Sequence, residues 1–110
     1  MEAKMIAKWE TQVKKGILDF IILLLLKEGE KYGYELLEYI KQRTGYDMAE
    51  GTIYPLLNRL KDDQLIDSKW VEMETGMPRK YYTITPSGLT TLETMKHFWT
   101  TLTNNLNNLI

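Results

Sequence analysis

The chain has 110 residues, of which 44% are hydrophobic and 26% charged, and this apolar content suits one compact core but not two. It has no cysteine and a single histidine, His97, which excludes disulfides, thiolate metal sites and a cysteine–histidine nucleophile, so we expect no enzyme activity, metal or cofactor. The formal net charge of −1 argues against a nucleic-acid partner only if the charges are evenly spread.

Residues 1–15 carry more basic than acidic side chains. They carry Trp9 and Glu10 where an export signal would need an apolar core. Their lysines outnumber their glutamates, and Lys14 and Lys15 are candidates for contact with DNA phosphate, although a solvated surface position is open for each. The longest apolar run, Phe20–Leu26, is far shorter than the roughly 20 residues of a membrane span. We therefore expect a cytoplasmic protein with no membrane contact.

Two helices are predicted in the first 45 residues. The first spans about Thr11–Lys27, and its almost wholly apolar second half indicates a central, buried position. A turn over Glu28–Lys31 follows. Tyr34, Leu37 and Ile40 then recur at helical spacing, and Gly45 stands where a helix C-cap is expected. The second helix is therefore short and amphipathic.

A third helix is predicted from Glu50 onwards. Thr52 is able to cap it, and Pro55 is expected in its first turn, where a missing N–H costs no intrahelical hydrogen bond. Its apolar positions form one stripe: Ile53, Leu56, Leu57 and Leu60. Two helices joined by a brief turn, with another helix ahead of them, form the arrangement from which helix-turn-helix domains are built.

Strand-type residues follow the third helix. Ser68–Glu74 and Arg79–Thr85 flank a Gly- and Pro-containing tip and alternate roughly between outward and inward positions, which predicts a β-hairpin. Three helices followed by a basic, aromatic hairpin make a winged helix. The expected fold class is therefore mainly α with a small β-hairpin, with a winged helix-turn-helix over residues 1–85 and a C-terminal dimerisation helix over residues 86–110.

Several motifs resemble the PadR family of transcription regulators and occur in the order typical of it: Tyr32–Leu36, Gly51–Leu60, Gln64–Ile66 and Gly76–Thr85. The similarity runs from about Gly16 to Gly88. Gln64 stands where the family often has glycine, and Met77 stands where it often has a basic residue or proline. The resemblance implies a winged-helix protein that binds double-stranded operator DNA.

Four polar positions lie off the apolar stripe of the third helix and are candidates for contact with DNA: Thr52, Tyr54, Asn58 and Arg59. An asparagine side chain can pair bidentately with adenine and an arginine with guanine, so Asn58 and Arg59 are candidate base readers. A phosphate contact or a solvated position is the alternative for each. Tyr54 is expected to pack where the helix meets the wing or to touch the DNA backbone.

Arg79 and Lys80 lie in the hairpin with no acidic neighbour in residues 76–82. A hairpin tip projects from the body of the protein, so these cations are candidates for phosphate or minor-groove contact. For Arg79, an ion pair with Glu72 or Glu74 across the hairpin is the alternative.

A long helix is predicted over Pro86–Leu109, with Thr85 as its cap. Its apolar residues step by three or four and form a near-heptad seam: Leu89, Leu92, Met95, Trp99, Leu102, Leu106 and Leu109. At a rise of 1.5 Å per residue this helix is about 36 Å long, more than so small a domain can cover. We therefore expect a homodimer on a pseudo-palindromic operator, with Met5, Ile6, Trp9 and Val13 laid against the seam.

Trp99 has a further role by resemblance. In multidrug-sensing PadR proteins with one C-terminal helix, a tryptophan at the matching place lines a pore between subunits and stacks with planar aromatic ligands. The resemblance implies such an effector site at Val13, Met95, Trp99 and Leu102, although packing in the dimer seam is the alternative. The predicted function is thus a DNA-binding repressor released by a small aromatic or hydrophobic ligand. The alternative is a winged-helix module that binds protein without specific DNA binding.

Overall fold

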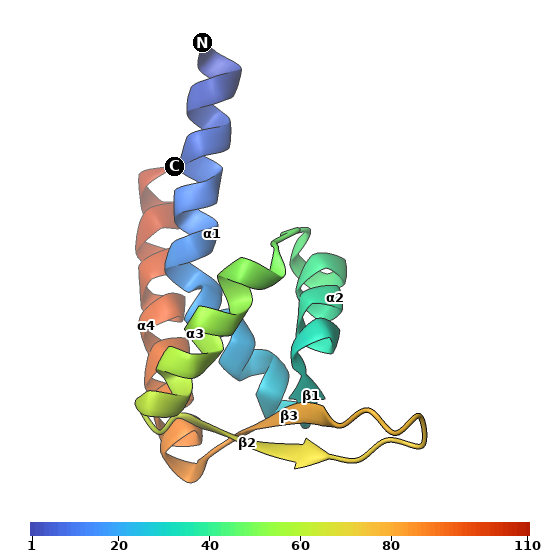
Figure 1. Cartoon of the computed structure of the whole chain (residues 1–110). Helices are drawn as coiled ribbons and strands as arrows, with labels where there is room; N and C mark the ends of the chain where they lie inside the picture. The colour runs from blue at the N-terminus through green and yellow to red at the C-terminus, as the bar shows by residue number, and fades with distance from the viewer.

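The computed structural model describes residues 1–110 as four helices and three strands: α1 (Glu2–Lys27), β1 (Lys31–Tyr32), α2 (Gly33–Thr44), α3 (Glu50–Asp62), β2 (Ile66–Val71), β3 (Arg79–Ile84) and α4 (Pro86–Leu109). In Figure 1, α1 and α4 run side by side, and the β2–β3 hairpin projects from the body as a wing. The structure confirms the predicted mainly helical winged-helix fold. None of the helices combines the length and apolar character needed to cross a membrane.

α1 is the axis of the core. Its second half supplies five buried side chains that are at most 4% exposed: Leu18, Ile22, Leu23, Leu25 and Leu26. Side chains from α2, α3, the sheet and α4 pack around them, among them Leu36, Leu57, Tyr82 and Leu92. The predicted start near Thr11 was wrong, because the helix already begins at Glu2. No glycine or proline interrupts residues 1–15, so helical hydrogen bonding extends through them although residues 2–13 are exposed.

A buried ammonium group closes the C-terminal end of α1. Lys31 is only 7% exposed, and its Nζ donates to the carbonyl oxygens of Leu25 at 2.8 Å and Gly29 at 3.1 Å. The same nitrogen lies 5.2 Å from the centroid of the Tyr39 ring. The Leu25 carbonyl oxygen also accepts from the Glu28 N–H at 3.1 Å, so the ammonium is its second donor, and a cation at a helix C-terminus interacts favourably with the helix dipole. Lys31 therefore ends α1 and starts the sheet at the same point.

The sheet contains a strand that the sequence pattern does not indicate. Its order is β1-β3-β2, with all neighbours antiparallel. β1 has only two residues, too few to show alternation, so Lys31 was wrongly predicted to lie in a turn. The first hairpin strand runs from Ile66 to Val71 instead of from Ser68 to Glu74. Ile66 pairs with Ile84 and Val71 with Arg79, so β3 occupies nearly its predicted range.

Helix boundaries match the sequence signals unevenly. Gly45 ends α2 with a left-handed φ of 75°, and the Thr85 hydroxyl caps α4 by accepting from the Gly88 N–H at 2.9 Å, both as predicted. α3 begins at Glu50 as predicted, but its N-cap is Ala49, so Thr52 does not cap it. Pro55 lies beyond the first turn, and the helix continues through it. The carbonyl that loses its donor belongs to Gly51, which is exposed to water.

The buried ammonium of Lys31 generates a stability prediction. Lys31→Ala should lower the free energy of unfolding by about 1 to 3 kcal/mol, because the buried carbonyl oxygen of Leu25 loses its hydrogen bond from the ammonium group. Lys31→Met keeps the aliphatic stem and should lose most of the same free energy. Urea unfolding followed by circular dichroism measures both.

Lys69→Met is the control, because it breaks an exposed pair with Glu30 of 3.0 Å and should change the unfolding free energy by no more than about 1 kcal/mol. Equally small changes in all three variants would show that the buried ammonium contributes no more than a surface charge.

Candidate nucleic-acid interface

α3 has one buried face, formed by Ile53, Leu56, Leu57 and Leu60. With about 3.6 residues per turn, the opposite face carries Gly51, Pro55, Asn58 and Asp62. Tyr54 and Lys61 lie on one flank, and Thr52 and Arg59 lie on the other. All eight of these residues are exposed. α3 therefore presents a hydrogen-bonding surface to solvent while its buried face holds it against the core.

The Tyr54 flank faces the wing. The Tyr54 ring lies directly over Gly33 at the start of α2, where an added Cβ would meet the ring and hydroxyl at 2.5 to 2.7 Å. Only glycine therefore leaves room for this packing. Lys61 Nζ donates to Ser68 Oγ at 2.7 Å and ties the end of α3 to β2. Burial, and then the charge of Glu50, raise the pKa of Tyr54, so its hydroxyl stays protonated and able to donate.

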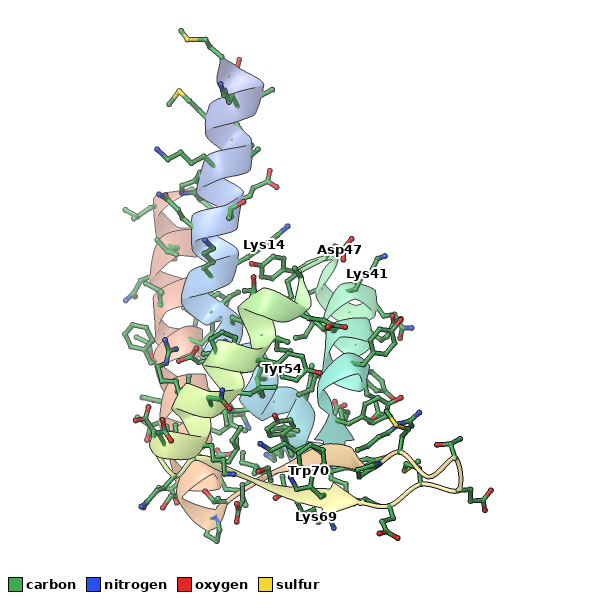
Figure 2. All side chains as sticks on the ribbon, in the orientation of Figure 1. Lys14, Lys41, Asp47, Tyr54, Lys69 and Trp70 are labelled. Atoms are coloured by element: carbon green, nitrogen blue, oxygen red, sulfur yellow. The ribbon has the colours of Figure 1, made fainter.

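A cleft of about 470 Å³, here called the wing cleft, opens between α3 and the hairpin. Aromatic and basic side chains line most of it: Tyr32, Tyr54, Trp70, Arg79, Lys80 and Tyr82, with Asn58 at its α3 side. Figure 2 shows Tyr54 on α3 and Trp70 on β2 at this junction. The Arg79 guanidinium lies 4.5 Å from the Tyr32 ring centroid. Lys80 Nζ lies 5.7 Å from the Trp70 ring centroid and 5.9 Å from that of Tyr82.

Two cations of the wing, Arg79 and Lys80, have no acidic partner, whereas Lys69 on β2 is paired with Glu30 at 3.0 Å. The ion pairs of the chain involve neither Arg79 nor Lys80, so the alternative pairing of Arg79 with Glu72 or Glu74 does not occur. Stacking on aromatic rings orients both cations without neutralising them. The wing cleft can therefore accept an anion. Sequence reasoning missed Tyr32 and Trp70, because the first lies far from the wing in sequence and the second was interpreted only as a strand residue.

The opposite flank of α3 is tied to α1. Arg59 Nη2 donates to both carboxylate oxygens of Asp19 at 2.8 Å. The Arg59 side chain is 60% exposed and that of Asp19 is 35% exposed. Sequence reasoning assigned Arg59 to DNA contact and assigned nothing to Asp19. The two residues are 40 positions apart, so no local pattern could reveal the pair.

The two candidate lysines, Lys14 and Lys15, lie on α1 about one turn before Asp19 and form no ion pair. Lys15 is exposed and lies one helical turn before Asp19, on the same side of α1. Lys14 is partly buried, with its Nζ 5.4 Å from the centroid of the Tyr46 ring in the loop between α2 and α3. Unpaired cations thus lie on both sides of α3: Lys14 and Lys15 on α1, and Arg79 and Lys80 on the wing.

An apolar groove of about 940 Å³ lies between α1 and α4. It brings together all four residues predicted for ligand binding, namely Val13, Met95, Trp99 and Leu102. Phe20 also lines the groove, and its ring centroid lies 6.0 Å from that of Trp99 at an interplanar angle of 47°. Sequence reasoning missed Phe20, because the apolar run Phe20–Leu26 indicates only general burial.

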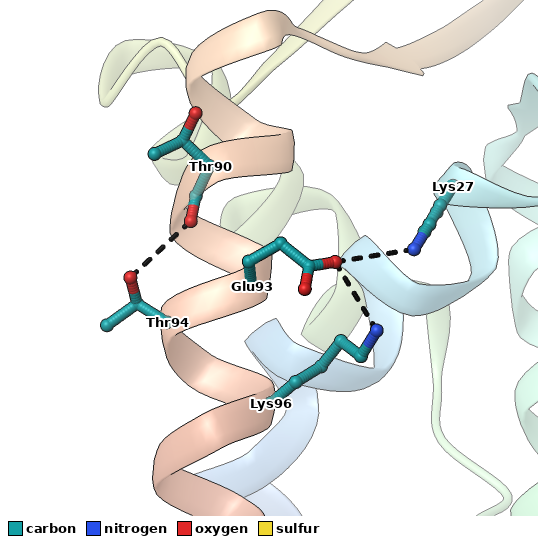
Figure 3. A network of polar contacts seen from close by, with 5 residues as sticks. All are labelled: Lys27, Thr90, Glu93, Thr94 and Lys96. Carbon is teal, nitrogen blue, oxygen red and sulfur yellow. Dashed lines mark hydrogen bonds and ion pairs between the residues drawn. The ribbon is translucent and has the colours of Figure 1, made fainter.

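A polar cluster fixes the start of α4 to the end of α1 (Figure 3). Glu93 Oε1 accepts from Lys96 at 3.3 Å and from Lys27 at 3.4 Å. The hydrogen bond from Lys96 and its charge, followed by those of Lys27, lower the pKa of Glu93. The Glu93 carboxylate therefore stays ionised at neutral pH, and the apolar groove lies between helices that are also joined by charge.

Comparisons with known proteins agree with this geometry. Residues 22–94 match the transcriptional regulator PadR-like family. The negative transcriptional regulator PadR of Bacillus subtilis is 35% identical over 74 residues, which are 66% of this chain and 41% of that protein. The chain thus spans less than half of this longer relative.

Solved structures extend the similarity. A PadR-like transcriptional regulator of Bacillus cereus is 39% identical, with a TM-score of 0.81 over 89% of this chain and 95% of that one. Bacillus subtilis PadR in complex with operator DNA is 33% identical, with a TM-score of 0.67 over 72% of this chain and 45% of that one. The chain belongs to the PadR-like family of transcriptional regulators and is not an enzyme.

Proposed function

We propose that this chain is a sequence-specific DNA-binding regulator that places α3 in the major groove and the wing on the adjacent DNA backbone. The observation that carries the proposal is the exposed hydrogen-bonding face of α3 between two sets of unpaired cations. Phosphates border each DNA groove, so a helix that reads bases needs cations beside it and hydrogen-bonding groups on it. The likeness to a relative that was crystallised with operator DNA supports DNA as the partner.

Each candidate residue has a proposed role that follows from its place. Asn58 lies on the outer face of α3 and reads a base edge, for which its amide suits adenine. Thr52 and Arg59 approach the groove from the α1 flank. Tyr54 donates its hydroxyl to the DNA backbone from the rim of the wing cleft. Arg79 and Lys80 bind phosphate from the wing, and Lys14 and Lys15 bind phosphate from α1.

The proposed active form is a homodimer in which residues 86–110 join two winged helices, each formed by residues 1–85. The support is apolar surface that the single chain leaves exposed on both long helices: Trp9 is 61%, Phe98 65%, Leu102 36% and Leu106 46% exposed. The same face of a second copy is the simplest cover for this surface. Two recognition helices would then read half-sites roughly 34 to 36 Å apart.

We further propose that the apolar groove binds a planar aromatic effector and that binding releases a repressor from its operator. The support is the exposed rim of the groove, together with the Trp99 ring, which lines the groove with Val13, Met95 and Leu102 and offers a stacking surface. A ligand can cause release only if it favours one spacing of the two recognition helices. Similarity to a protein described as a negative regulator supports repression.

Selection of DNA tests the proposal directly. The protein is used to enrich duplexes from a randomised library, and the selected duplex is compared with a scrambled duplex of equal composition in a mobility-shift assay. Preference for the selected duplex supports sequence-specific binding. A failure to enrich any sequence would contradict it and leave the protein-binding module as the function.

Titrations by fluorescence anisotropy at several salt concentrations should distinguish the variants that lose a phosphate contact from those that lose a base contact. Arg79→Ala and Lys80→Ala should weaken binding to both duplexes alike and flatten the salt slope by about 1 unit for each lost contact. Asn58→Ala should cost about 1 to 3 kcal/mol on the selected duplex only. Lys69→Ala is the matched control, because this wing lysine is already paired with Glu30. An unchanged slope in both wing variants would remove the wing from the interface.

The dimer proposal predicts that Leu106→Glu yields monomers with weakened operator binding. The variant puts a carboxylate into the apolar seam, where an unpaired buried charge costs several kcal/mol. Sedimentation equilibrium measures the mass. Asn108→Glu adds the same charge on the opposite side of α4 and should remain dimeric. A dimeric Leu106→Glu variant would contradict the assignment of α4 as the dimer contact.

The effector proposal predicts that Trp99→Ala remains a DNA-binding dimer but loses both affinity for planar aromatic compounds and release by them. The substitution removes the stacking surface without charging the groove. Calorimetric titration with a panel of such compounds measures binding, and Trp99→Phe, which keeps a ring, should retain part of it. No binding to the wild type, or a monomeric Trp99→Ala, would make Trp99 a packing residue and leave the DNA-binding proposal intact.

A further inference from the structure

We infer that Asp19 is a positioning residue for DNA recognition and that it acts through Arg59. This inference rests on the proposed function, because it assumes that α3 reads DNA. The geometry that points to it is the contact across the α1–α3 flank, where one nitrogen of a guanidinium meets both oxygens of a carboxylate at 2.8 Å.

The contact leaves most N–H donors of the Arg59 guanidinium without a partner. Both hydrogen bonds of the Arg59 guanidinium come from Nη2, so Nη1 and Nε donate to no protein atom. A guanidinium is planar and rigid, so a carboxylate that holds one nitrogen also sets the direction in which the remaining N–H groups point. Asp19 thus orients the free donors of Arg59 beside the outer face of α3, where a base edge can accept them.

An exposed arginine side chain has no fixed orientation by itself. It carries about 2 kcal/mol of rotamer entropy, and immobilising such a chain on binding costs affinity. An exposed ion pair contributes little to folding stability. The pair joins the exposed flank of α3 to a helix that is anchored in the core, with Leu18 only 2% exposed beside Asp19. The flexible side chain is therefore held from the most rigid part of the molecule.

The charge of Asp19 gives this role a measurable signature. A carboxylate beside a DNA-binding surface repels phosphate, and its neighbours here are basic: Arg59 itself and Lys15 one turn earlier on α1. Removal of this charge should tighten binding to any DNA, because the electrostatic part of binding does not depend on sequence. If Asp19 orients Arg59, the same removal should also lower discrimination between sequences. The affinity for a scrambled duplex should therefore rise, while the ratio of the affinities for the selected and the scrambled duplex should fall.

The test uses the full chain with a duplex selected by the wild type and its scrambled counterpart. Arg59→Ala should lower the ratio of the two affinities by roughly 5- to 150-fold, the range of a good base contact. Asp19→Asn should lower the same ratio by several-fold while it tightens binding to the scrambled duplex. In the Arg59→Ala background, Asp19→Asn should lower the ratio no further, because the two residues act as one unit.

Glu28→Gln is the matched control, because it breaks another arginine–carboxylate pair, with Arg43 at 2.6 Å, away from α3. It should leave the ratio unchanged, and circular dichroism melts should confirm that every variant is folded. If Asp19→Asn raised the affinity for both duplexes by the same factor, Asp19 would only compete with DNA phosphate for Arg59, and the inference would be overturned. Additive losses in the double variant would also overturn it. A wild type without preference for any duplex would overturn the proposed function as well.

Discussion

The rest of the structure depends on the burial of the second half of α1. Its leucines and isoleucines lie against α2, α3, the sheet and α4, so every element that carries a candidate functional side chain is placed relative to the same helix. Full burial of such side chains contributes roughly 1.5 to 3 kcal/mol each. Lys31 completes this arrangement, because its buried ammonium donates to the carbonyl oxygens of Leu25 and Gly29 around the end of α1 and its backbone opens the sheet.

α1 changes its surroundings near residues 19 and 20. Asp19 meets Arg59 on α3, whereas Phe20 meets Trp99 across the apolar groove. Before this point the helix is largely exposed, and after it the helix is largely buried. The proposed effector site and the proposed DNA-reading helix therefore contact consecutive residues of one rigid element.

The arrangement of charge explains how a chain with a net charge of −1 can suit a polyanion. The wing orients Arg79 and Lys80 by stacking them on aromatic rings, and no carboxylate neutralises them. Some carboxylates are paired with cations away from the outer face of α3, as in the contacts of Glu28 with Arg43 and of Glu93 with Lys96, whereas Asp62 at the end of α3 is in no ion pair. Local potential, and not total charge, decides whether a surface can meet phosphate.

The sequence by itself determined the elements whose signals are local. Helical periodicity and capping residues such as Gly45 and Thr85 indicated the helices and the winged-helix class, and the stripe Ile53–Leu60 separated the buried face of α3 from its polar residues. Only the tertiary structure decided the pairings of Tyr32 with Arg79, of Gly33 with Tyr54 and of Asp19 with Arg59. These contacts join segments far apart in the chain. No local pattern marks either partner of a pair, because the partners meet only when the elements pack around α1. The same reason hid β1, because two residues become a strand only when β3 lies beside them.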